Sequence, residues 1–138
     1  EAYENGGHAY HATMPTDSLR RFRDIMKETE EYGFEKVRAE QQELGDKVRE
    51  MLVAKGIKSV ASEGFQAPGV VVSYTDDKGI QTGKKFAELG FQIAAGVPLQ
   101  CDEPEDYQSF RLGLFGLDKL HNIGRTVEKL EKALDAIY

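Results

Sequence analysis

The sequence has few of the features that mark secreted, membrane-spanning or nucleic-acid-binding proteins. Cys101 is the single cysteine among 138 residues, so no intramolecular disulfide can form, which fits a reducing compartment. No apolar run approaches the roughly 20 residues that a helix needs to cross a bilayer. There is no run of lysines and arginines, and a net charge of −6 disfavours a nucleic-acid surface. These absences predict a cytoplasmic protein without membrane or nucleic-acid partners.

The histidines are also too few and too isolated to predict a metal centre. His8 and His11 lie three residues apart, but the pair by itself is an incomplete set of metal ligands. We therefore predict no metal site. The surrounding residues 1–15 contain a Gly-Gly pair and end at Pro15 without a helical or strand period, which indicates an arm rather than a folded element.

Two amphipathic helices are predicted after this arm. Thr16 is a suitable N-cap for the first, and Gly33 interrupts the periodic pattern. The second pattern begins at Phe34 and ends near Lys55. The apolar positions are Leu19, Phe22, Ile25 and Met26 in the first helix, and Phe34, Val37, Leu44, Val48 and Met51 in the second. The narrow apolar face of the second helix predicts packing against a core, the alternative being a surface for a partner.

After residue 56 the pattern becomes that of a small sheet with further helices. We predict strands at Ile57–Ala61, Val70–Tyr74, Phe91–Ala94 and around Arg111, a short helix at Thr82–Leu89, and a last helix beginning between Asp118 and Asn122. The length suits one domain with a core. The element order predicts an α/β (α+β) fold with two layers, in which helices cover one face of a largely antiparallel sheet of about three to four strands.

The strand around Arg111 carries the most informative pattern. Phe110, Leu112 and Leu114 alternate with Arg111, so the apolar residues predict a core face and the arginine the opposite face. The glycines at 113 and 116 predict open space beside it. A guanidinium on a rigid strand suits bidentate capture of a carboxylate or phosphate. The alternative is a solvated arginine, or one paired with a surface acid.

Two motifs resemble one enzyme family. Arg111–Leu120, followed by Val127–Leu130, resembles the C-terminal end of class V pyridoxal-phosphate aminotransferases, most closely the alanine–glyoxylate and serine–glyoxylate group. Ala9–Pro15 resembles that group's join between the large and small domains. The motifs stand in the expected order and at about the expected separation, so the resemblance covers essentially the whole chain.

The resemblance implies a fold-type-I homodimer in which a large cofactor domain precedes this small domain. Residues 1–15 would then be the join, and residues 16–138 the C-terminal domain. The implied reaction moves an amino group from a small amino acid, of the serine or alanine type, to a 2-oxo acid such as glyoxylate or pyruvate. Arg111 stands where the family binds the substrate carboxylate. Tyr10 and Thr13 stand where the family helps to hold the cofactor phosphate of the neighbouring subunit.

One departure from the family is important. The family's Schiff-base lysine lies upstream of the join motif, so we expect it before Glu1, together with the aspartate that contacts the pyridine nitrogen. No lysine of this chain stands in a comparable context. We therefore expect the chain to be inactive alone and to carry no covalently bound pyridoxal phosphate. The alternative is a stand-alone α/β module that binds a ligand or a protein and catalyses nothing.

Overall fold

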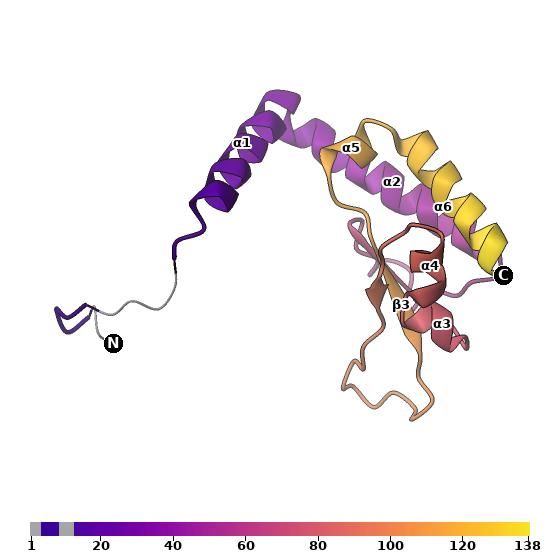
Figure 1. Ribbon diagram of the computed structural model, residues 1–138. Coiled ribbons are helices and arrows are strands. Elements are labelled where there is room, and N and C mark those ends of the chain that lie inside the picture. Colours follow the sequence, from indigo (N-terminus) through magenta and orange to yellow (C-terminus); the bar gives the residue numbers. More distant parts are fainter. Residues whose placement is uncertain (1–3, 9–12) are drawn as a thin grey trace. The chain divides into compact units, whose positions relative to one another are not determined.

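The computed structural model describes residues 4–8 and 13–138 (Figure 1). Contacts within the chain divide it into two compact units, Glu1–Phe34 and Glu35–Tyr138, and each unit is described by itself. This division does not test the expected join at residues 1–15, which stays a prediction. Within the described residues, no helix is both long enough and apolar enough to span a membrane.

The N-terminal unit contains one long helix, α1 (Thr16–Tyr32). The predicted N-cap is wrong by one residue, because the carbonyl of Pro15 accepts the first helical hydrogen bond, from the amide of Leu19 at 3.0 Å. Gly33 ends the helix as predicted, with a φ of 102° that favours glycine. The predicted apolar face exists, but α1 buries none of its residues. Its exposed apolar side chains are Leu19, Phe22, Ile25 and Met26.

The remaining elements form a mixed α/β unit. In chain order they are α2 (Phe34–Ala54), β1 (Val70–Tyr74), α3 (Lys78–Gln81), α4 (Lys84–Glu88), β2 (Ala94–Ala95), β3 (Ser109–Gly113), α5 (Leu117–Leu120) and α6 (Ile123–Ile137). The three strands make an antiparallel sheet in the order β1-β3-β2, so β3 is central. The predicted class, a mixed α/β domain with an antiparallel sheet, is confirmed.

Three predicted elements differ from the structure. Ile57–Ala61 is not a strand, and within it only Ser59 forms an isolated bridge, to Ser73. The helix predicted at Thr82–Leu89 is shorter, since α4 spans only Lys84–Glu88. A second short helix, α3, precedes the predicted range, and Gly83, with a left-handed φ of 78°, separates the two. Of the strand predicted at Phe91–Ala94, only Ala94 lies in a strand, the two-residue β2 that ends at Ala95.

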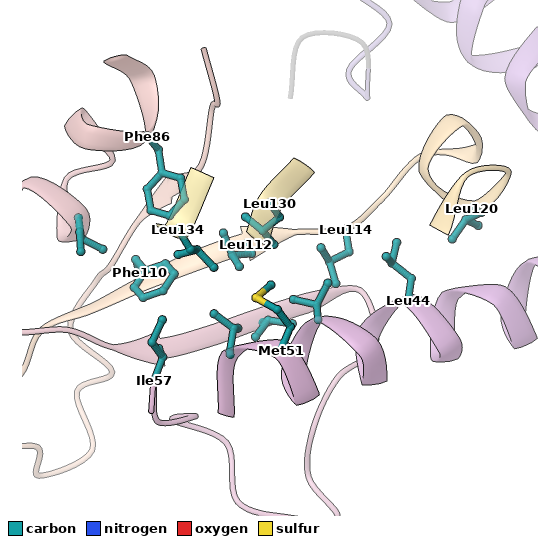
Figure 2. Close-up of a cluster of buried hydrophobic side chains, with 14 residues drawn as sticks. Leu44, Met51, Ile57, Phe86, Phe110, Leu112, Leu114, Leu120, Leu130 and Leu134 are labelled. Carbon is teal, nitrogen blue, oxygen red and sulfur yellow. The ribbon is translucent and has the colours of Figure 1, made fainter. Parts of the chain in front are cut away.

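The core lies between the sheet and the two long helices α2 and α6 (Figure 2). Leu44 and Leu134 are fully buried in it. On the sheet side, the predicted alternation is confirmed, since Phe110, Leu112 and Leu114 are buried. Helices α2 and α6 run side by side in Figure 1, and Lys55, directly after α2, forms ion pairs with Glu131 and Asp135 of α6.

Alternate residues of β1 and β3 face away from this core. Val71 and Leu112 are paired and buried, whereas the next pair, Val72 and Arg111, is half-buried. The arginine therefore stands on the sheet face opposite α2 and α6, as the alternation predicts.

Candidate functional site

Strand β3 holds the backbone of Arg111 rigidly. Arg111 pairs with Val72 of β1 on one side and with Ala94 of β2 on the other. Its chain neighbours are anchored in the core, with Phe110 0% and Leu112 4% exposed. The backbone position is thus fixed by two strands and two buried side chains, while the arginine side chain stays half-exposed.

The guanidinium has one intramolecular partner in the described part of the chain. Its Nε–H donates a hydrogen bond to the carbonyl oxygen of Ala95 at 2.9 Å. Arg111 forms no ion pair with any residue in 4–8 or 13–138. Its two terminal nitrogens are therefore available to an anion, and the pairing with a surface acid that we considered as an alternative is not formed there.

Strand β2 approaches β3 closely because a glycine follows it. A Cβ atom on Gly96 would lie 1.7 Å from the carbonyl oxygen of Ser109, far inside any real contact distance. The amide of Gly96 also donates to the carbonyl oxygen of Gln81 at 3.2 Å, which ties the end of β2 to α3. The position of the Ala95 carbonyl, and hence the partner of Arg111, depends on this close approach.

The open space predicted beside two glycines is only partly present. A Cβ atom on Gly113 would meet the ring of Phe115 at 3.8 Å, so this aromatic side chain borders the space. The same ring leaves no room for a side chain at Gly69, where a Cβ atom would lie 2.5 Å from it. The prediction is wrong for Gly116, whose Cβ atom would lie 2.9 Å from the Asp118 carboxylate. Gly116 instead serves the turn, with a φ of 111°.

The proposed cofactor residues lie at the other end of the chain. Tyr10 falls outside the described residues, as does His11. Thr13 is exposed and belongs to the N-terminal unit, whereas Arg111 belongs to the C-terminal unit. Their assignment to a cofactor phosphate stays a prediction. Within the residues that the structure describes, no three His, Cys, Asp or Glu side chains gather as a metal site would require.

Sequence reasoning missed the residues that orient Arg111. A hydrogen bond to a main-chain carbonyl, such as that of Ala95, has no residue-type signature. Gly96 carried a weak signal, because a glycine in or beside a strand often marks a close backbone approach. Phe115 was visible only as the residue after Leu114 in an alternating pattern, with nothing to show that its ring folds back over Gly69.

A groove lies elsewhere, beyond the end of β1. Its volume is about 550 Å³, and Arg111 is not among its lining residues. The charged and aromatic side chains that line it include Lys55, Lys58, Tyr74, Asp106, Tyr107 and Tyr138. Lys55 is already paired with Glu131 and Asp135, and burial raises the pKa of the Tyr138 phenol. The groove is lined by both lysines and aspartates, so its charges do not indicate one class of ligand.

Comparison with known proteins returns no match, either among family models or among curated proteins.

Proposed function

We propose that this chain is the small C-terminal domain of a class V pyridoxal-phosphate-dependent aminotransferase, and that Arg111 binds the substrate carboxylate. The observation that carries the proposal is a half-exposed guanidinium on the central strand, whose terminal nitrogens have no partner among the described residues. The motif Arg111–Leu120 and the join motif Ala9–Pro15 connect that geometry to this enzyme family.

A single fixed arginine suits both halves of a transamination. The amino acid and the 2-oxo acid share the α-carboxylate, so one planar guanidinium can bind either through two parallel hydrogen bonds. Holding that group on a strand between two neighbours limits the motion of the bound substrate, which favours reaction. Serine- and alanine-type donors, with glyoxylate or pyruvate as acceptor, all carry the required anion.

Pyridoxal phosphate would supply the electron sink of the reaction. The hydroxyl groups of Tyr10 and Thr13 have the right chemistry for phosphate oxygens, and in a homodimer they would serve the neighbouring subunit. The lysines of this chain are poorly suited to form the Schiff base with the cofactor. All of them lie within the described residues, and none is buried. The three half-buried lysines are Lys55, Lys85 and Lys119. Lys55 forms an ion pair with Asp135, and Lys85 forms one with Asp77 at 2.5 Å. Lys119 donates a hydrogen bond to the Phe115 carbonyl oxygen at 2.7 Å.

The test is kinetic and uses the product of the complete reading frame that contains this sequence. Arg111→Lys keeps the charge but loses the planar two-point contact. We expect kcat/KM to fall roughly ten- to a hundredfold for the amino acid and the 2-oxo acid alike, with cofactor absorbance unchanged. Arg125→Lys, at an exposed arginine of α6, is the matched control and should leave the kinetics unchanged.

Two results would count against the proposal. A complete protein that neither binds pyridoxal phosphate nor transaminates would favour the stand-alone binding module. Unchanged kinetics in Arg111→Lys together with a lower melting temperature would make Arg111 a structural residue.

A further inference from the structure

We infer that Gly96 is a positioning residue for Arg111, and that it makes the arginine bind a carboxylate end-on, through its two terminal nitrogens. This inference rests on the proposed function for the identity of the anion. Its geometric part, the dependence of Arg111 on Gly96, stands on contacts in this chain alone.

The first step is the hydrogen bond that Arg111 makes before any ligand binds. A guanidinium can grip a planar carboxylate along an edge that includes Nε, or along the edge between the two terminal nitrogens. Nε–H is already donated to the carbonyl oxygen of Ala95 at 2.9 Å. The edge that includes Nε has thus lost one of its two donors to Ala95. The edge between the two terminal nitrogens keeps both donors, so a carboxylate can bind there end-on.

The second step is the dependence of that hydrogen bond on Gly96. Ala95 is the last residue of β2, and it pairs with Phe110, the residue before Arg111. Any side chain at position 96 would collide with the backbone of Ser109, 1.7 Å from a Cβ atom. The neighbour is a main-chain carbonyl in the central strand, so it cannot move aside as a flexible side chain would.

A two-residue strand also has little else to hold it. Its backbone is held by the pairing with β3 and by the hydrogen bond from the Gly96 amide to the Gln81 carbonyl oxygen at 3.2 Å. A shift of β2 away from β3 would carry the Ala95 carbonyl away from Arg111. The guanidinium would then be free to rotate, and its Nε–H would return to solvent.

The test is side-chain nitrogen NMR on the 138-residue chain. In the unmodified protein, the Nε–H of Arg111 should exchange with water roughly tenfold more slowly than that of Arg125, as expected for one hydrogen bond of ordinary net strength. Arg125 is exposed and has no such bond among the described residues. Equal exchange at the two arginines would overturn the inference without any variant being made.

Gly96→Ala provides the second measurement, with Gly124→Ala as its control. A Cβ atom at Gly124 would meet nothing within 4 Å. We expect Gly96→Ala to raise Arg111 Nε–H exchange to the rate of Arg125, and Gly124→Ala to leave it slow. A Gly96→Ala protein that keeps its backbone spectrum and also keeps slow Nε–H exchange would overturn the role of Gly96. If Gly96→Ala does not fold, the measurement on the unmodified chain still decides whether the hydrogen bond between Arg111 and Ala95 exists.

The binding mode is tested with sodium acetate, against sodium chloride at the same ionic strength. Acetate should shift the terminal nitrogen resonances of Arg111 while its Nε–H exchange remains slow. Faster Nε–H exchange on acetate binding, with the Ala95 bond broken, would overturn end-on capture. Slow Nε–H exchange with no response to acetate would contradict the proposed function and would still support the Arg111–Ala95 hydrogen bond from which the role of Gly96 is argued.

Discussion

The Nη2 atom of Arg49 donates a hydrogen bond to the carbonyl oxygen of Val70 at 3.2 Å, and so ties helix α2 to the first residue of strand β1. The same nitrogen donates to the carbonyl of Ala67 at 2.5 Å, and Nη1 donates to that of Gly45 at 3.4 Å. Arg49 is only 8% exposed. Burial lowers the pKa of its guanidinium, and the nearby charge of Asp46 opposes this change. Hydrogen bonds to backbone carbonyls therefore replace much of the hydration that this buried cation loses.

Replacing Arg49 with alanine should destabilise the C-terminal unit. Carbonyl oxygens of residues 45, 67 and 70 would lose the hydrogen bonds that the guanidinium donates, and the removed side chain would leave a void. We expect the free energy of unfolding to fall by about 2–4 kcal/mol, measured by denaturant titration. Arg38→Ala on the same helix, at an exposed arginine, should change it by less than about 0.5 kcal/mol. Equal losses in the two variants would contradict a structural role for Arg49.

Two valines of α2 give a matched test of the core. Val48 is 0% exposed and Val53 is 66% exposed. Val48→Ala should lower the free energy of unfolding by about 1.5–3 kcal/mol, because it removes buried methyl groups and leaves a cavity. Val53→Ala removes the same atoms from a solvated position and should cost less than about 0.5 kcal/mol. If Val53→Ala cost as much as Val48→Ala, the assignment of the buried face of α2 would be wrong.

We expect Glu103 to hold the loop before β3 in a pH-dependent manner. Its carboxylate accepts hydrogen bonds from the amides of Cys101, Gln100 and Leu99, at 2.8, 2.9 and 2.6 Å. These backbone bonds, that from Cys101 first, lower its pKa to about 2. Since the folded pKa lies below the ordinary value of 4.5, the stabilisation is fully present above 4.5 and is lost as the pH falls through about 2.

Glu103→Gln should therefore speed exchange of the amides of residues 99–101 at neutral pH, because it removes the charge and one acceptor oxygen. The difference from the unmodified protein should vanish as the pH falls through about 2. Hydrogen exchange followed by NMR measures both effects. The control is Glu105→Gln in the same loop, which should leave these amides unchanged at every pH. A difference that persisted at the lowest pH would show that the glutamate charge is not the cause.

The isolated chain should not form a stable internal aldimine with pyridoxal phosphate and should not transaminate. Its lysines are exposed or half-buried rather than held in a desolvated pocket that would make one of them a specific nucleophile. Borohydride reduction followed by peptide mapping should find only low and scattered labelling. Stoichiometric labelling of one lysine, accompanied by turnover, would show that this chain carries its own catalytic lysine.

Local patterns predicted the larger elements well. The three- and four-residue spacing of apolar side chains indicated α1, α2 and α6, and β-branched residues indicated β1. Alternation placed Phe110 in the core and Arg111 on the opposite face, because side chains of a strand point to its two faces in turn. Each of these features depends on residues that are close together in the sequence, and so the sequence alone determined them.

The surroundings of Arg111 were decided only by the tertiary structure. Ile57–Ala61 and Phe91–Ala94 have strand-like composition, yet strand pairing depends on which backbone lies alongside. Arg49 looks like an ordinary charged helix residue until the carbonyls of a distant loop surround it. The contact between Arg111 and Ala95 joins a side chain to a main-chain atom 16 residues away. Every residue except proline offers the same backbone donor and acceptor, so only the path of the chain could select these partners.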